Sequence, residues 1–250
     1  CIIHFMKISE TKIKFDQKNV ESSYIISCSY DVQCIKPGNV NYVSGHPDTA
    51  IDDFVKSYEV TSNMITLPNL SLGQRIYKCV EGTKEAVDTN TNLGIILLCS
   101  VFIQSLLADE KYTLSEAIKA IIMDASQQDV TDVCNAISLA DPGGLGSHES
   151  YDVRSRPEIS LHEIMSLSSD YDQISNQYSK YFTDIFNFII PTLHNSISKI
   201  KDTKYAISYS FLKILEKYPD SHITRKYDHK IAKKTSKEAS DLIKILDGDT

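Results

Sequence analysis

The chain has 250 residues, of which 42% are hydrophobic, and it carries a formal net charge of -7 at pH 7. A chain of this length can bury a large core, and no stretch rich in Pro, Gly or Ser marks a linker, so we expect a single domain over residues 1–250. The acidic balance argues against a nucleic-acid surface, because affinity for phosphate backbones comes from clustered Lys and Arg. Any positively charged binding site is therefore confined to a small part of the protein surface.

The N-terminal sequence CIIHFMK is short and has neither a basic region nor a small-residue cleavage signature, so it does not indicate a signal peptide. We expect residues 1–17 to form an irregular extension, with the residues before Met6 arising from a mis-assigned start. Six cysteines are scattered without a CxxC pair, which favours reduced thiols and a cytoplasmic location. The apolar run 93–107 is shorter than the roughly 20 residues of a membrane span, so it predicts a buried helix and no membrane partner.

Apolar residues recur with helical spacing along nearly the whole chain. Capping boxes, in which a hydroxyl and an acid or amide three residues later satisfy each other's free amides, begin three of the runs, at Ser71, Thr113 and Ser160. Alternating strand-like segments are missing, which argues against a sheet. The pattern predicts an all-α, single-domain bundle of about ten helices with active-site loops at helix ends. The expected helices span residues 18–34, 49–65, 71–87, 92–108, 113–124, 127–140, 160–177, 178–200, 203–217 and 224–246.

The first loop with turn-forming residues is Lys36-Pro37-Gly38-Asn39-Val40, and His46 and Asp48 follow soon after it. One reading is a helix terminator followed by a turn, and a histidine with a structural role. The functional reading makes Lys36 a phosphate ligand and Gly38 a point of close backbone approach. Both readings stay open on the sequence alone.

The segment Asn90-Thr91-Asn92-Leu93-Gly94 opens the most apolar of the expected helices. One asparagine is needed as the N-cap. A helix N-terminus that is buried in a core also offers free amides and the positive end of the helix dipole, so the second asparagine predicts an anion site.

The stretch from Asp129 to Val153 is the most informative in the chain. Asp129 and Asp132 share a helix face, and the helix runs into a glycine-rich turn and then a loop with acids and arginine. A solvated acidic face is the plain reading. Paired acids beside such a turn also suit Mg²⁺, which takes a few carboxylates and keeps water and substrate phosphate as its other ligands. The turn and loop residues of interest are Gly143, Gly144, Gly146, His148, Glu149, Asp152 and Arg154.

Two further segments contain several polar and charged side chains. In Ser169-Asp170-Tyr171-Asp172 the acids diverge on a helix, so one of them faces inward, and Gln177 follows. The segment 219–226 sets His222, Arg225 and Lys226 around an expected helix start, where cations oppose the helix dipole. A bound polyphosphate, a neighbouring helix C-terminus or an acidic side chain would compensate them. Arginine is scarce in the chain, so its placement in these loops reflects either chance or bidentate recognition of phosphate or carboxylate.

Taken together, these motifs resemble the triphosphoribosyl-dephospho-CoA synthase family over residues 36–226. The resemblance rests on eight elements in order: KPGNV at 36–40, DDFVKS at 52–57, NTNLG at 90–94, DVTDVCNAI at 129–137, PGGLG at 142–146, DV at 152–153, DQISNQY at 172–178 and PDSHITRK at 219–226. The sequences of these motifs are more similar to the archaeal and stand-alone branch of the family than to the enzymes of citrate lyase clusters. In those enzymes a His and a Lys follow the Asn-Thr pair, where Asn92 and Leu93 stand here.

The resemblance implies a transferase that joins ATP to 3′-dephospho-CoA, with small-molecule substrates as partners. The 2′-hydroxyl of the CoA ribose attacks C1′ of the ATP ribose and expels adenine, which gives the precursor of an acyl-carrier prosthetic group. Mg²⁺ and cations would offset the charge of the triphosphate. Implied roles are metal binding or C1′ stabilisation for Asp129 and Asp152, with Asp132 at the metal and Asp172 as a further catalytic acid. The implied substrate-binding residues are Lys36, Gly38, Asn39, His46, Asn90, Asn92, Gly143, Gly144, Gly146, Arg154, Gln177, His222, Arg225 and Lys226.

Three alternatives remain beside this reading. The first is a homologue that uses ATP with a different acceptor, which the departure at Asn92 and Leu93 favours. The second is an all-α Mg²⁺-dependent nucleotide hydrolase, and the third is a non-catalytic helical module that senses a nucleotide. The resemblance leaves the acceptor and the oligomeric state open, with a homodimer among the possibilities.

Overall fold

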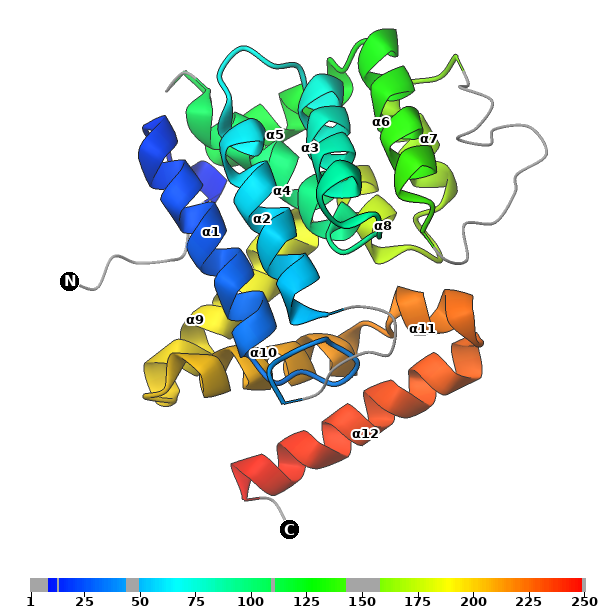
Figure 1. Cartoon of the computed structure of the whole chain (residues 1–250). Coiled ribbons are helices and arrows are strands. Elements are labelled where there is room, and N and C mark those ends of the chain that lie inside the picture. Colours follow the sequence, from blue (N-terminus) through cyan, green and yellow to red (C-terminus); the bar gives the residue numbers. More distant parts are fainter. Residues whose placement is uncertain (1–8, 13, 44–49, 109–110, 143–157, 249–250) are drawn as a thin grey trace.

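The computed structural model describes residues 9–12, 14–43, 50–108, 111–142 and 158–248. Within these ranges the chain forms twelve α-helices and one π-helical segment and no strand, which confirms the all-α expectation (Figure 1). The elements are α1 (Gln17–Gln33), α2 (Ile51–Thr66), α3 (Leu72–Val87), α4 (Leu93–Leu107), α5 (Leu114–Met123), α6 (Gln127–Ala140), α7 (Leu161–Leu167), α8 (Gln173–Ser179), η3 (Ile185–Ile189), α9 (Ile190–Lys199), α10 (Thr203–Lys217), α11 (Ser221–Lys226) and α12 (His229–Asp247).

Local side-chain hydrogen bonds explain where several helices begin. The three expected capping boxes are confirmed, with Ser71, Thr113 and Ser160 as N-caps of α3, α5 and α7. A fourth box joins Ser126 and Asp129 at the start of α6. Each box satisfies amides that the first turn of a helix leaves without a partner.

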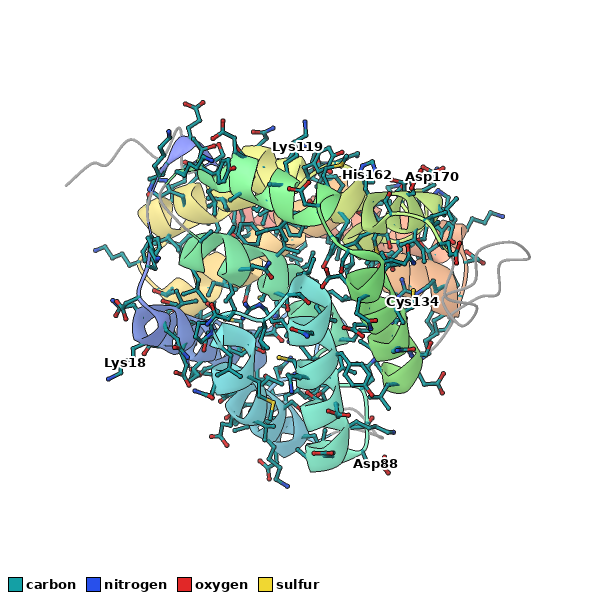
Figure 2. The ribbon with its side chains drawn as sticks, turned by 90° about the horizontal axis from the view of Figure 1, so that it is seen from above. Lys18, Asp88, Lys119, Cys134, His162 and Asp170 are labelled. Atoms are coloured by element: carbon teal, nitrogen blue, oxygen red, sulfur yellow. The ribbon has the colours of Figure 1, made fainter. Side chains whose placement is uncertain are left out.

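The most apolar helix, α4, is central, as its sequence predicts. It packs against α3, α5 and α2, and its side chains Ile96 and Val101 are fully buried (Figure 1). Phe102 makes edge contacts with Phe182 and Phe186 at centroid distances of 5.2 and 5.6 Å. Seen from above in Figure 2, charged side chains such as Lys18, Asp88 and Lys119 lie around the outside of the bundle. Among the described residues, no helix combines the length and apolarity that crossing a membrane requires.

A smaller second layer follows at the C-terminal end of the chain. Leu212 and Leu215 of α10 pack against Ala239 and Ile243 of α12, apart from the main core. The hydroxyl of Tyr209 donates to the Asp247 carboxylate at 2.8 and 3.0 Å, which ties the end of α12 to α10. In Figure 1 this layer lies below the main bundle, with α11 at the junction between the two.

Three of the expected long helices are interrupted. The helix expected at 160–177 is two helices, because Asp172 is an extended N-cap that accepts a hydrogen bond from the Ser175 amide at 2.9 Å. The helix expected at 224–246 is α11 and α12, and Asp228 is the N-cap between them. The helix expected at 178–200 breaks at Tyr181 and Phe182, which have positive φ angles, and continues as η3 and α9. Helical spacing of apolar residues continues across each break, so the periodicity alone does not locate them.

The described residues before α1, 9–12 and 14–16, are attached to the bundle. The Phe15 amide donates to the Leu106 carbonyl at 2.9 Å, and the Leu114 amide donates to the Thr11 carbonyl at 3.0 Å. The expectation about the residues before Met6 lies outside the described residues.

Candidate functional site

The N-terminal end of α4 brings together segments that lie far apart in the sequence. The Thr91 hydroxyl lies 2.6 Å from the Ser57 hydroxyl of α2, and the Thr83 hydroxyl of α3 donates to the Asn92 side-chain oxygen at 3.1 Å. On another side, Ile174 of α8 packs against Gly94. The segments 52–57, 90–94 and 172–178 therefore meet at this end of the bundle.

Gly94 is needed for this arrangement because it lets α8 approach. A Cβ atom at position 94 would lie 2.9 Å from Cδ1 of Ile174, which is closer than real Cβ contacts. The absence of a side chain at Gly94 therefore lets a neighbouring helix pack closely against α4.

The two asparagines before α4 have different roles. The Asn90 side-chain oxygen accepts a hydrogen bond from the Leu93 amide at 3.2 Å, so Asn90 caps the helix. Asn92 occupies the N-cap position but makes no side-chain cap bond. Its side chain is 6% exposed and turns toward Thr83, and within the described part of the chain its amide Nδ2 has no hydrogen-bond partner.

A small, shallow hollow that is open to solvent lies beside Asn92. Its walls come from the C-terminal half of α3, the segment before α4 and the last residue of α6: Val80, Thr83, Lys84, Thr89, Asn90, Asn92, Leu93 and Ala140. The Lys84 ammonium lies 2.9 Å from the Asp88 carboxylate, so its charge is partly offset. Thr83 and Lys84 were not expected as site residues. A buried Thr after Cys79 and Val80 on the apolar face of α3 is the signal that would have identified Thr83.

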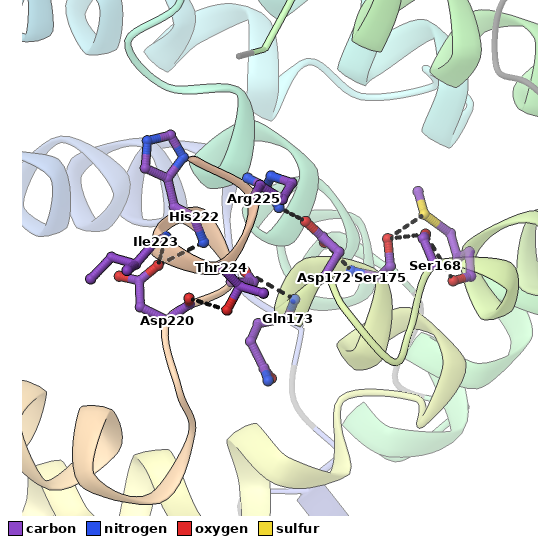
Figure 3. A network of polar contacts seen from close by, with 11 residues as sticks. Ser168, Asp172, Gln173, Ser175, Asp220, His222, Ile223, Thr224 and Arg225 are labelled. Carbon is purple, nitrogen blue, oxygen red and sulfur yellow. Dashed lines mark hydrogen bonds and ion pairs between the residues drawn. The ribbon is translucent and has the colours of Figure 1, made fainter. Parts of the chain in front are cut away.

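Asp172 and Arg225 form an ion pair that joins the main bundle to the C-terminal layer (Figure 3). One Asp172 oxygen caps α8 through the Ser175 amide, and the other accepts from the Arg225 guanidinium. The Gln173 amide donates to the Ser221 hydroxyl at 3.3 Å beside this pair. The two residues were expected to hold separate roles as a catalytic acid and a phosphate ligand. The structure pairs them with each other.

The cations of α11 correct one expectation. α11 begins at Ser221, and the Asp220 carboxylate caps it by accepting from the His222 amide at 2.7 Å and the Ile223 amide at 3.1 Å (Figure 3). Arg225 and Lys226 lie in its last turn, where positive charge is favourable to the helix dipole. The helix dipole therefore does not require a bound polyphosphate to offset the charges of Arg225 and Lys226. His222 and Lys226 have exposed side chains.

Asp129 lies at the other end of the bundle. One of its oxygens accepts from the Gly73 amide at 2.9 Å, and the other accepts from the amide and hydroxyl of Ser126 at 2.9 and 2.7 Å. Burial opposes ionisation, but the hydrogen bonds from Ser126, Ser71 and Gly73 outweigh it and lower the pKa of Asp129. Ala140 lies about 16 Å away along α6 at 1.5 Å per residue. The structure thus uses Asp129 to join α6 to α3 and does not bring it to the α4 end.

The described residues do not assemble the expected metal site. Asp132 lies near Asp129 and accepts from the Gln128 side chain at 2.8 Å. Among the residues that the structure describes, no group of three or more His, Cys, Asp or Glu side chains is placed to hold a metal ion. Asp152, the third expected ligand, lies outside the described residues.

The loop after α1 is a turn that is held by hydrogen bonds and an ion pair. Gly38 has a φ of 80°, which favours glycine, and the Asn39 amide donates to the Lys36 carbonyl at 3.1 Å. The Asn39 side chain donates to the Asp31 carbonyl at 2.9 Å, and the Lys36 ammonium pairs with the Asp31 carboxylate. These contacts agree with a helix terminator followed by a turn.

The remaining expected residues divide into two groups. Gln177 is 5% exposed, and its side-chain oxygen has no hydrogen-bond partner in the described part of the chain. The others lie outside the described residues: His46, Gly143, Gly144, Gly146, His148, Glu149, Asp152 and Arg154.

Comparison with known proteins adds one finding. A family model with the description CitG, ATP:dephospho-CoA triphosphoribosyl transferase, matches residues 17–250. This range includes every sequence element that meets at the α4 end. No curated protein and no solved structure matches the chain.

Proposed function

The chain belongs to the CitG family of ATP:dephospho-CoA triphosphoribosyl transferases and is a transferase, and from this premise we propose that its active site lies at the α4 end of the bundle. The observation that carries the proposal is the meeting of Asn92, the start of α8 and Arg225 through contacts between α3, α4, α8 and α11. Asn92 and Arg225 are 133 positions apart in the sequence, and the contacts of α8 with α4 and of α11 with α8 support a shared site for them.

The proposed reaction forms one bond and breaks another at C1′ of the ATP ribose. The 2′-hydroxyl oxygen of 3′-dephospho-CoA bonds to C1′, and the bond from C1′ to the adenine nitrogen breaks. The hydroxyl proton passes to a base, and adenine takes up a proton as it leaves. The sugar is oxocarbenium-like in the transition state, as in glycoside hydrolysis, so a nearby carboxylate would stabilise it.

The described residues support distinct roles in this reaction. Arg225 supplies a cation at the junction of α8 and α11, and its guanidinium suits a phosphate group. Asp172 has both oxygens engaged, so we propose that it positions Arg225 and does not itself take the proton. The carboxylate near C1′ is proposed from the sequence to be Asp152.

We propose that Mg²⁺ enters as part of the MgATP substrate, held by phosphate oxygens. The two described acids that were expected to bind it, Asp129 and Asp132, do not fit a metal site, because the oxygens of Asp129 accept hydrogen bonds that hold α6 to α3. No reaction step is therefore assigned to an ion held by these side chains.

A homologue that uses ATP with a different acceptor is the second candidate. Asn92 and Leu93 occupy the positions where the enzymes of citrate lyase clusters have a His and a Lys, and Leu93 is buried in the apolar core. The loss of two basic side chains at this point favours an altered acceptor site.

The proposal is tested by incubating the protein with ATP and Mg²⁺, with and without 3′-dephospho-CoA, and measuring free adenine by chromatography. Adenine release that depends on 3′-dephospho-CoA, with a product of the expected mass, supports the transferase reaction with this acceptor. Adenine release without 3′-dephospho-CoA, or release of phosphate only, contradicts the proposal.

A cytoplasmic setting is also proposed, and the free thiols of Cys28, Cys34, Cys79, Cys99 and Cys134 support a reducing compartment.

A further inference from the structure

We infer that Asn92, together with the N-terminal amides of α4, binds a phosphate oxygen of a substrate. This contact makes the site selective for a ligand that carries the phosphate. This inference rests on the proposed function, since it assigns a ligand group to one part of the proposed site. The phosphate belongs either to ATP or to the diphosphate of dephospho-CoA. Both present the same chemistry, and the experiment below separates them.

The first observation is an unused donor on a buried side chain. Thr83 donates to the Asn92 side-chain oxygen at 3.1 Å, which fixes the amide so that its nitrogen points away from Thr83. Asn92 is 6% exposed and Thr83 is 4% exposed, so both are held in place by packing. The Asn92 Nδ2 atom has no hydrogen-bond partner among the described residues. A buried donor without a partner is unfavourable, and an incoming acceptor oxygen would remove that cost.

The second observation is the start of α4 itself. The first backbone bond of the helix runs from the Ile96 amide to the Asn92 carbonyl at 2.9 Å, and Asn90 caps the Leu93 amide. The amides of Gly94 and Ile95 have no partner in the part of the chain that the structure describes. These amides and the helix dipole favour a negatively charged oxygen over a neutral one.

The third observation is the make-up of the hollow that Asn92 lines. The hydroxyls of Thr83 and Thr89 and the Lys84 ammonium lie around it, and its other walls are the apolar side chains Val80, Leu93 and Ala140. The Lys84 charge is partly offset by Asp88, so a single phosphate group matches the remaining charge better than a whole triphosphate. Among the residues that the structure describes, no acidic side chain lines the hollow.

The test uses Asn92→Asp, which keeps the oxygen that accepts from Thr83 and replaces the free donor with a negatively charged oxygen. Binding is measured by calorimetry with three probes: MgATP, inorganic triphosphate and 3′-dephospho-CoA. Loss of a charged hydrogen bond predicts affinity about ten- to a hundredfold weaker for the ligand whose phosphate binds here. Weakening of MgATP and triphosphate together identifies ATP as the source, and weakening of 3′-dephospho-CoA alone identifies the acceptor.

Two further variants keep the test decisive. Thr83→Val removes the hydroxyl that orients Asn92 and should weaken the same probe by a smaller factor, even if Asn92→Asp does not fold. Asn195→Asp adds the same charge on an exposed position of α9 and should leave binding unchanged. Unchanged affinity for all three probes in both Asn92→Asp and Thr83→Val overturns the inference while leaving the proposed function intact. A wild-type protein that binds none of the probes overturns both, and wild-type binding without adenine release overturns only the proposed function.

Discussion

Arg225 in the last turn of α11 pairs with Asp172, the residue that caps α8. The pair is half-buried and joins residues that are 53 positions apart in the chain. It therefore connects the C-terminal layer to the end of the bundle where α4 begins.

Arg225→Ala should lower adenine release strongly and raise the KM for ATP, because the variant removes the cation at this junction. Its effect on the free energy of unfolding should be small, about 1 kcal/mol, as for partly exposed ion pairs. Steady-state kinetics and urea unfolding measure the two effects. Lys226→Ala removes the neighbouring exposed cation and is the matched control; equal kinetic losses in both variants would show that the pairing with Asp172 is irrelevant.

Gly94→Ala should disturb the start of α8, because the new Cβ meets Cδ1 of Ile174. That atom is the end of a side chain that can move, so the variant should lose about 1 kcal/mol of stability and a larger fraction of its activity. Ile174→Val removes the clashing atom, and the double variant should recover activity. Failure of the double variant to recover would mean that Gly94 serves the reaction in some way other than through α8.

Gly73→Ala should be far more damaging to the fold than Gly94→Ala. A Cβ at position 73 would lie 2.5 Å from the Asp129 Cα and 2.6 Å from its carbonyl oxygen, and backbone cannot move aside cheaply. We expect a loss of about 3 kcal/mol or more, measured by thermal or urea unfolding. Comparable stability of the two alanine variants would contradict the close packing of α3 on α6.

Asp129→Asn should destabilise the protein while leaving the activity of the folded fraction intact, because Asp129 lies at the far end of α6 from the proposed site. The new amide cannot accept from both Gly73 and Ser126 as the carboxylate does, which predicts a loss of about 1–3 kcal/mol. Unfolding and adenine release are measured on the same preparation. Complete loss of adenine release with unchanged stability would restore Asp129 as a catalytic acid.

The stability that Asp129 contributes should also depend on pH. Its pKa is lowered in the folded protein, so its contribution is fully present above the unfolded pKa of about 3.9 and is lost as pH falls through the lower folded pKa. Urea unfolding at a series of acidic pH values should show a steeper decline for the wild type than for Asp129→Asn. Asp170→Asn, at an exposed aspartate, is the control and should follow the wild type.

Asp152→Asn should abolish adenine release and leave the helical circular dichroism spectrum unchanged, if Asp152 is the carboxylate near C1′. Binding of MgATP should weaken less than turnover, because a charge that stabilises the transition state acts mainly on kcat. Normal turnover in this variant would remove Asp152 from the proposed mechanism.

The helices and their starts could be largely predicted from the sequence, since apolar spacing and capping residues act over a few positions. The boxes at Ser71, Thr113 and Ser160 are examples. The breaks at Asp172 and Asp228 were missed, because an aspartate in a polar stretch is compatible with both a helix surface and an N-cap. Of the residues predicted for the site, Asn92 and Asp172 lie on segments that meet where α4 begins, and Arg225 pairs with Asp172, whereas Asp129 contacts Gly73 at the other end of α6. Their roles in the reaction stay a prediction.

The sequence by itself determined the all-α class, the buried helix at 93–107 and the family, because these depend on local spacing and on ordered motifs. Only the tertiary structure decided which polar residues become neighbours. Asp129 lies at the start of α6 against Gly73, whereas Ala140 at the end of the same helix lines the hollow beside Asn92. Arg225 is distant in sequence from Asp172, but the packing of α11 on α8 makes them partners. A helix converts sequence separation into distance along its axis, so the neighbours of each acid follow from how the helices pack.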